Sequence, residues 1–363
     1  MQQLRLKKPD GRNLILYSRR SISSELTAPS PNVDPVNPNP HLRWHPLRGE
    51  WVSYASHRQN RTFLPPAEYN PLAPMKNPQI PTELPDGDYD VAVFENLFPA
   101  LAPTPGLPPE LSVKTASGLG ACEVVVFDRD SKATLGGLPL SQIELIFEVW
   151  TERFREIGAR PGIEYVMPFE NRGVEVGVTL HHPHGQIYAY SFVPPVAVRE
   201  LELQKKYWSE HKTGLLENVI QSELKDACRI LYQGPEVVAF LPAFARYPYE
   251  VWVAPYRTCP TLADLTVVER LDYARALKTV LLKFDGLWSR PFPYLMAFHQ
   301  APTKGAHPWA HVHTEFYPAY RTKDRLKYLA GTELGAGMFA NDALPEDKAK
   351  ELQAVKVQFG ATD

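Results

Sequence analysis

The sequence predicts an α+β fold made of two similar halves, with mainly antiparallel sheet and flanking helices. In each half, strand patterns surround one amphipathic helix and a His-x-His motif comes last, at His182–His184 and at His311–His313. Repetition of one such unit indicates a duplication. Helices are also too few per strand for a doubly wound parallel sheet. With 363 residues, the chain is long enough for two halves of roughly 150 residues each.

The first half contains three runs typical of strands. Ser141 and Glu144 match a capping box, in which each side chain bonds the other residue's backbone N–H, so a helix is expected to begin there. Its apolar residues recur at helical spacing, and Gly158 ends it. The expected strands are residues 121–127, 163–169 and 184–190.

The second half repeats this order. Thr266 and Glu269 form another capping box before a helix. We therefore expect a boundary between a first domain, residues 1–195, and a second, residues 196–363. A further strand is expected near the N-terminus, at residues 14–17. The strands expected in the second half are residues 237–241, 251–254 and 294–298, and a last one beginning at His311.

The composition excludes several classes of protein. Hydrophobic residues make up 44% and charged residues 22%, as in ordinary globular chains, and the net charge is −2. This charge favours neither nucleic acid nor an anionic membrane as a partner. The cysteines, Cys122, Cys228 and Cys259, form no Cys-x-x-Cys pair. No apolar run is long enough to span a membrane, so a cytoplasmic protein is expected.

The segment from His182 to Gln186 carries the strongest chemical signal. Side chains two apart on a strand share a face, so His184 and Gln186 are expected side by side, with His182 if the strand begins that early. A neutral imidazole can attack phosphorus when its other nitrogen is fixed by an acceptor. A neighbouring amide can stabilise the transferring phosphoryl group. Buried structural histidines or a metal site remain the alternative at this point.

Several motifs, in order along most of the chain, resemble the galactose-1-phosphate uridylyltransferases of the histidine-triad-like superfamily. The strongest is His182-Pro183-His184-Gly185-Gln186, preceded by Asn171-Arg172-Gly173. The other matching segments are Trp51, His57-Arg58 with Arg61, Glu95-Asn96 with Phe98, residues 299–317 and Lys327-Tyr328-Leu329-Ala330-Gly331-Thr332-Glu333.

The resemblance implies a nucleotidyltransferase of galactose metabolism. His184 would attack the α-phosphorus of UDP-glucose, release glucose 1-phosphate, and hold the uridylyl group until galactose 1-phosphate takes it in a ping-pong reaction. Gln186 would bind the transferring phosphoryl group. The residues that match nucleotide-binding positions are Arg58, Arg61, Asn96, Phe98, Asn171, Gly177 and Thr179.

The C-terminal motif matches positions that hold the sugar phosphate. These positions are Lys327, Tyr328 and Glu333. In the family this segment reaches the active site of a neighbouring subunit, so the resemblance implies a homodimer. Thr332 stands where an aromatic residue is common, and no glutamine follows Glu333. Recognition of the hexose is therefore less sharply implied than chemistry at phosphorus.

The resemblance implies one metal site and the loss of another. Glu200, His299, His311 and His313 match a set that binds zinc or iron in relatives, and imidazoles with a carboxylate suit either ion. A hydrogen-bonded histidine cluster is the alternative. Asn70-Pro71-Leu72-Ala73 stands where relatives carry Cys-x-x-Cys, so His182 is left without thiolate partners and no zinc is expected there. His307 has no matched role.

Two other functions compete with uridylyl transfer. A related transferase or phosphorylase could use another nucleotide sugar, such as ADP-glucose with free phosphate. Gly185-Gln186 favours the uridylyltransferase, because phosphorylase-like relatives tend to carry serine there. Smaller histidine-triad proteins bind or hydrolyse nucleotides, but the chain length and the segment from Lys327 to Glu333 argue against that role.

Overall fold

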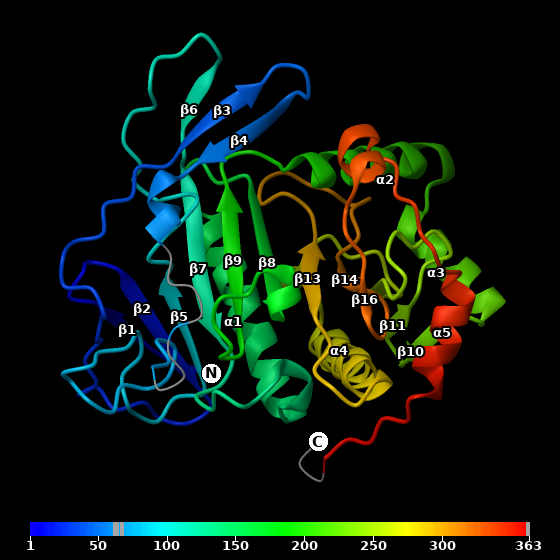
Figure 1. Cartoon of the computed structure of the whole chain (residues 1–363). Helices are drawn as coiled ribbons and strands as arrows, with labels where there is room; N and C mark the ends of the chain where they lie inside the picture. Colours follow the sequence, from blue (N-terminus) through cyan, green and yellow to red (C-terminus); the bar gives the residue numbers. More distant parts are fainter. Residues whose placement is uncertain (61–64, 66–68, 361–363) are drawn as a thin grey trace.

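An eleven-stranded, antiparallel sheet forms the centre of the computed structural model, which describes residues 1–60, 65 and 69–360 (Figure 1). Neighbouring strands in this sheet pair antiparallel throughout. The strands, in spatial order, are β1 (Gln2–Lys7), β2 (Asn13–Ser18), β5 (Val91–Glu95), β7 (Gly120–Val126), β9 (His184–Tyr190), β8 (Tyr165–Arg172), β13 (Tyr294–His299), β14 (His313–Pro318), β12 (Val251–Pro255), β11 (Val237–Phe240) and β10 (Ile230–Gln233).

The strand order shows the duplication directly. From the outside inward, the first half runs β5-β7-β9-β8 and the second runs β11-β12-β14-β13. The halves meet where β8 pairs with β13, with Asn171 opposite Leu295. The predicted α+β class is therefore confirmed. The division of the chain at residue 195 stays a prediction, because one continuous sheet crosses it.

The helices cover the sheet unequally. The long helices of the two halves lie on one face, where Ile143, Phe147 and Leu277 join a single buried cluster with the sheet. On the opposite face, Leu216 and Ile220 pack against Val238 and Phe240. The helices are α1 (Leu140–Gly158), α2 (Pro195–His211), α3 (Leu215–Asp226), α4 (Val267–Leu287) and α5 (Pro345–Ala354).

One of the two predicted capping boxes is present. Thr266 and Glu269 bond each other's backbone N–H groups at the start of α4, as predicted. The cap predicted at Ser141 was wrong, because α1 begins one residue earlier, after Pro139, and has no side-chain cap. Gln142 instead donates from Nε2 to the backbone oxygens of Asp90 and Phe127. These bonds to the sheet fix the start of the helix in place of a local cap.

The N-terminal residues form a hairpin, β1–β2, that extends the sheet beyond β5. The strand predicted at residues 14–17 is confirmed within β2. A separate small sheet projects from one end of the molecule, as Figure 1 shows. It contains β4 (Glu50–Tyr54), β3 (His41–His45) and β6 (Thr115–Ser117), and a second small sheet contains β15 (Tyr320–Thr322) and β16 (Arg325–Leu326).

None of the described helices combines the length and the apolar character needed to cross a membrane.

Candidate active site

His184 is the first residue of β9, as predicted, and its ring is held by a local hydrogen bond. Its Nδ1 lies 2.7 Å from the backbone oxygen of His182. A carbonyl only accepts, so Nδ1 carries the proton and Nε2 keeps its lone pair. Burial lowers the pKa of His184 from its usual value, so the ring is neutral near pH 7. The imidazole is thus in the form that a nucleophile at phosphorus requires.

A cavity of about 330 Å³ lies beside His184 on the sheet face opposite α1. Gly185 and Ile187 of β9 point to the core, which leaves His184 and Gln186 on the cavity side. The predicted site residues that this cavity brings together are Asn96, Phe98, Thr179, His184 and Gln186. Residues far apart in sequence therefore meet in one cavity, which is lined by both apolar side chains and polar groups.

Asn171 lies on the other side of His184. It lines a second cavity, of about 230 Å³, and His184 lines both cavities. Gly177 ends the short helical turn Val174–Val176 with a φ of 79°, a left-handed conformation that favours glycine. His184 is thus the point at which the two cavities meet.

Arg58 does not line the cavity beside His184. Its Nη1 donates to the backbone oxygen of Phe98 at 2.8 Å and to the hydroxyl of Tyr188 at 3.3 Å. In this arrangement it ties the loop that carries Phe98 to β9. Arg61, the other predicted arginine, lies outside the described residues.

His182 lies before β9 and uses both ring nitrogens in hydrogen bonds. Nδ1 accepts from Nδ2 of Asn70 at 3.0 Å, and Nε2 donates to the backbone oxygen of Asp128 at 2.7 Å. Burial also lowers the pKa of His182. The amide of Asn70 therefore holds His182 where relatives are expected to use metal. The sequence marks Asn70 only as part of the segment that lacks the two cysteines, and it does not predict this hydrogen bond.

The predicted sugar-phosphate residues lie in the C-terminal half, outside both cavities at His184. Lys327 Nζ donates to the backbone oxygen of Ala340 at 2.6 Å and lies 3.6 Å from Glu333 Oε1. Tyr328 is 72% exposed. Their role at the active site stays a prediction that depends on a second subunit.

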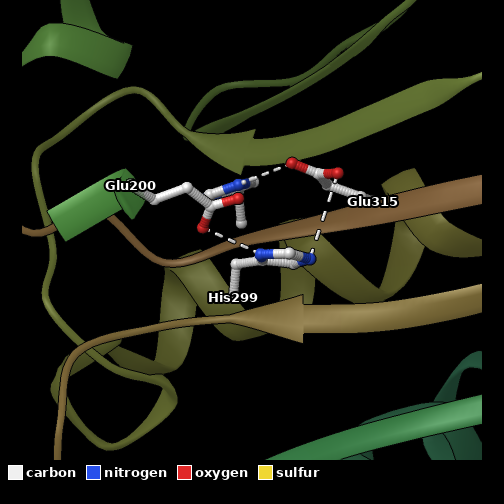
Figure 2. A group of neighbouring side chains, drawn as sticks. Glu200, His299 and Glu315 are labelled. Atoms are coloured by element: carbon white, nitrogen blue, oxygen red, sulfur yellow. Dashed lines mark hydrogen bonds and ion pairs between the residues drawn. The ribbon is translucent and has the colours of Figure 1, made fainter. Parts of the chain in front are cut away.

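Four acidic and histidine side chains in the second half form a group that could hold a metal ion. One ligand atom from each of Glu200, His299, His313 and Glu315 lies within 4.8 Å of all the others. Glu200 comes from α2, and Figure 2 shows it reaching the strands that carry His299 and Glu315. Two imidazoles and two carboxylates suit zinc or iron(II).

His311, predicted as a ligand, is not in this group. The strand β14 begins at His313, so His311 precedes it, and its Nε2 lies 2.9 Å from the backbone oxygen of Pro255. Its Nδ1 is buried with no hydrogen-bond partner among the described residues. Glu315 takes the fourth place, because it is two residues after His313 on the same strand face. That spacing was visible in the sequence.

The carboxylates give this group a strong preference for positive charge. Although burial opposes protonation, Glu315 and Glu200 raise the pKa of His299 to about 9. Although burial also opposes ionisation of Glu315, His299 and His313 hold its pKa well below the usual range. Arg246 and Tyr317 contact Glu315 at 2.6 and 2.5 Å. These shifts keep His299 protonated near pH 7 and paired with the two carboxylates, so an ion bound here would replace that proton.

Comparison with known proteins links this geometry to a family. Models of the N-terminal and C-terminal domains of galactose-1-phosphate uridyl transferase match residues 32–194 and 200–361. A galactose-1-phosphate uridylyltransferase from Thermotoga maritima is 36% identical over 325 residues, covering 88% of this chain and 99% of that protein. A solved uridylyltransferase structure gives a TM-score of 0.78 at 32% identity, with 87% and 98% of the two chains covered. An ADP-glucose phosphorylase from Arabidopsis thaliana with bound ADP-glucose gives 0.66 at 25% identity, with 88% and 100% covered.

Proposed function

The chain belongs to the galactose-1-phosphate uridylyltransferase family, and we propose that it exchanges UMP between UDP-glucose and galactose 1-phosphate through a uridylyl group on His184. The observation that carries this proposal is the hydrogen bond from His184 Nδ1 to the backbone oxygen of His182, at 2.7 Å. It leaves the Nε2 lone pair as the nucleophile, on a side chain that lines the cavity.

The reaction has two displacements at the α-phosphorus. The Nε2 lone pair forms an N–P bond while the bond to the bridging oxygen breaks, and glucose 1-phosphate leaves with that electron pair. A phosphate oxygen of galactose 1-phosphate then attacks the same phosphorus, and the N–P electrons return to His184. The Gln186 amide, on the same strand face, donates to a non-bridging oxygen as charge shifts.

The nucleoside half of the substrate occupies the cavity of about 330 Å³ beside His184. The apolar side chains of Phe94 and Phe98 cover the base, and Asn96 offers an amide at the same end. Asn171, which lines the second cavity at His184, faces the transferring phosphoryl group. For Gly177, Arg58 and Arg61, a role in nucleotide binding rests on the match to the family's motifs.

The metal group in the second half holds one zinc or iron ion, bound by Glu200, His299, His313 and Glu315. The ion supplies a structural link between α2 and the strands β13 and β14. None of these four residues lines either cavity at His184, which supports a structural role for the ion. No metal binds at His182, whose two ring nitrogens already bond Asn70 and Asp128.

The protein acts as a cytoplasmic homodimer on small phosphates, without a nucleic acid or membrane partner. A second subunit delivers Lys327, Tyr328 and Glu333 to the sugar phosphate. Support comes from the exposed ring of Tyr328 and from the lining of the two cavities at His184, which includes none of these three residues.

The decisive experiment is intact-mass measurement after incubation with UDP-glucose alone. We expect one UMP per chain, removed promptly by galactose 1-phosphate and only slowly by water. Absence of the adduct in an active protein would refute the covalent route.

A phosphorylase acting on ADP-glucose is the second candidate, favoured by the similarity to the plant ADP-glucose phosphorylase. It predicts an AMP adduct from ADP-glucose, released by inorganic phosphate. An adduct that forms only from ADP-glucose would replace uridylyl transfer with this function.

A further inference from the structure

Residues 1–31 precede the segment that matches the family, yet they reach the nucleotide cavity. They build the hairpin β1–β2 and return across the outer face of the sheet. Pro31 and Asn32, where this segment meets the family match, line the cavity beside His184. The added N-terminal segment is thus part of the wall of the substrate site.

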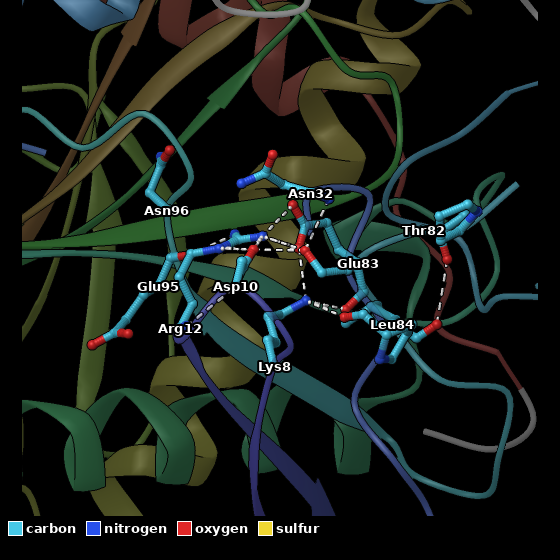
Figure 3. Close-up of polar contacts among 12 residues, drawn as sticks. Lys8, Asp10, Arg12, Asn32, Thr82, Glu83, Leu84, Glu95 and Asn96 are labelled. Carbon is cyan, nitrogen blue, oxygen red and sulfur yellow. Dashed lines mark hydrogen bonds and ion pairs between the residues drawn. The ribbon is translucent and has the colours of Figure 1, made fainter. Parts of the chain in front are cut away.

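A buried ion cluster holds the hairpin turn against the cavity wall (Figure 3). Lys8 Nζ lies 2.7 Å from Glu83 Oε2, and Arg12 Nη2 lies 2.8 Å from the same oxygen. Arg12 also pairs with Asp10 at 2.7 Å. Glu83 lines the cavity as well. Pairs of this kind are costly to break once buried, so the turn is rigidly placed.

Asn32 is tied to this cluster through Ser30. The backbone N–H of Asn32 donates to Ser30 Oγ at 3.1 Å, and Ser30 Oγ donates to Asp10 Oδ2 at 2.6 Å. The backbone N–H of Val36 donates to the backbone oxygen of Asp10 at 3.1 Å. The position of Asn32 therefore depends on the hairpin turn.

The two asparagine amides of the cavity have fixed orientations. Asn32 Nδ2 donates to the backbone oxygen of Asp34 at 2.7 Å, so its Oδ1 is left as an acceptor. Asn96 Oδ1 accepts from the backbone N–H of Phe98 at 2.8 Å, so its Nδ2 is left as a donor. Neither of these remaining atoms bonds to any residue in the described part of the chain. In Figure 3 both amide groups lie on the same side of the ion cluster.

The pairing of three strands shows the direction in which the cavity extends from His184. Gln186 of β9 is opposite Val124 of β7, and Val124 is opposite Phe94 of β5. Two strand spacings make about 10 Å between these positions of β9 and β5, so the cavity extends across β7 from the side of His184 toward Asn96 and Asn32. Phe94, Val124, Asn32 and Asn96 all line the cavity. The base therefore lies over β7 and β5, toward the asparagines.

We propose that Asn32 contacts the substrate base, with Oδ1 accepting from the uracil N3–H while Asn96 Nδ2 donates to an adjacent carbonyl oxygen. The N-terminal hairpin and its ion cluster thus set the base preference of the site. This assignment rests on the proposed uridylyl transfer and adds a residue that selects the base.

The test compares two substrates in two proteins. UDP-glucose and its 3-methyluracil analogue, which lacks the N3–H, are given to the wild type and to Asn32→Ala, and kcat/KM for adduct formation is measured. We expect the methyl group to cost the wild type about tenfold and the variant less than about twofold. As a control, Asn37→Ala replaces an exposed asparagine that follows Asn32 in the chain. In this variant the methyl group should cost about as much kcat/KM as in the wild type.

The outcomes separate this proposal from the function on which it rests. An equal cost of the methyl group in the wild type and in Asn32→Ala overturns the base contact, because a merely structural role lowers both substrates alike. Thermal unfolding of Asn32→Ala checks that it folds. A wild type that forms no adduct with UDP-glucose instead overturns uridylyl transfer itself.

Discussion

The two halves of the molecule place the same histidine arrangement in equivalent strands. His184 begins β9 and His313 begins β14. Each Nδ1 bonds the backbone oxygen two residues earlier, at 2.7 and 2.9 Å. His182 and His311 likewise each bond a backbone oxygen at the end of the adjacent strand, that of Asp128 or Pro255. The duplicated fold therefore fixes the same tautomer in both halves.

The residue two places after each histidine separates their chemistry. Gln186 is a neutral amide beside His184, which lines a cavity. Glu315 lies 3.2 Å from His313 Nε2 and belongs to a group with Glu200 and His299. The same backbone arrangement thus serves two roles. His184, beside the neutral Gln186, is suited to act as a nucleophile, and His313, beside the carboxylate of Glu315, is suited to bind a cation.

The covering of the sheet adds to this difference. Over the second half, α2 brings Glu200 onto the strands, beside an apolar cavity of about 320 Å³ that Glu200 and His313 also line. Over the first half, the cover comes from loops, including the segment that follows the hairpin β1–β2, and these leave a cavity. The two cavities differ in their lining: the one at His184 carries amide and carboxylate groups, whereas the one at His313 is lined mainly by apolar side chains.

Replacement of His184 should have the largest effect on activity, whereas replacement of its counterpart His313 should leave the transfer reaction in place. In His184→Asn we expect kcat to fall by about 10⁴-fold or more, with no UMP adduct by intact mass, because no other group can form the N–P bond. His313→Asn, as the matched variant in the other half, should still take up UMP while its bound metal is lost. An adduct on His184→Asn would show that another residue is the nucleophile.

Replacement of Gln186, the residue that differs between the two histidine motifs, should have the second-largest effect on activity. Gln186→Glu copies Glu315 into the first half and should lower kcat by about 10²- to 10³-fold, because an amide donor is lost and a carboxylate faces phosphoryl oxygens. Stopped-flow measurement of glucose 1-phosphate release follows the first step. A change below twofold would mean that Gln186 does not touch the phosphoryl group.

Removal of metal tests the second half. Dialysis against a chelator should lower the free energy of unfolding by about 3 kcal/mol, if metal is normally present at about 100 times its dissociation constant. Denaturant unfolding with and without zinc or iron measures this, and elemental analysis gives the ion. Metal far below one equivalent in a protein purified without chelators would contradict the site.

The pH dependence of adduct formation reports on His184. The neutral ring attacks and the protonated ring cannot. Burial lowers the pKa of His184, so activity should persist as pH falls to about 6.5, the usual histidine pKa, and decline only below it. In Gln186→Glu the new carboxylate should move this decline to higher pH. A wild-type decline centred above pH 7 would contradict the assignment.

Loss of the Asn70 hydrogen bond should have the smallest effect. His182 carries the backbone oxygen that orients His184, and Asn70 holds its ring. In Asn70→Ala we expect kcat to fall about fivefold with KM unchanged, in line with about 1 kcal/mol for one hydrogen bond. Recovery of activity in Asn70→Ala on addition of zinc would show instead that the site still binds metal.

The sequence alone predicted much of this protein, because its signals are local. Alternation placed His184 and Gln186 on one strand face, the two His-x-His motifs revealed the duplication, and Thr266 with Glu269 located the start of a helix. The first and third of these depend on residues within four positions of one another, where backbone geometry fixes the relation between side chains. The second depends on the recurrence of a short motif.

Tertiary structure decided the rest, because those relations depend on which strands pair and where they begin. The fold brings Glu200 of α2 to His299, His313 and Glu315, whereas Nε2 of His311 lies against the backbone oxygen of Pro255. Bonds from Gln142 to the sheet, rather than a cap at Ser141, set the start of α1. Asn32 reaches the cavity only because the hairpin β1–β2 pairs beyond β5 and its ion cluster closes on Glu83. Contacts between residues this distant in sequence arise from packing, which no local pattern encodes.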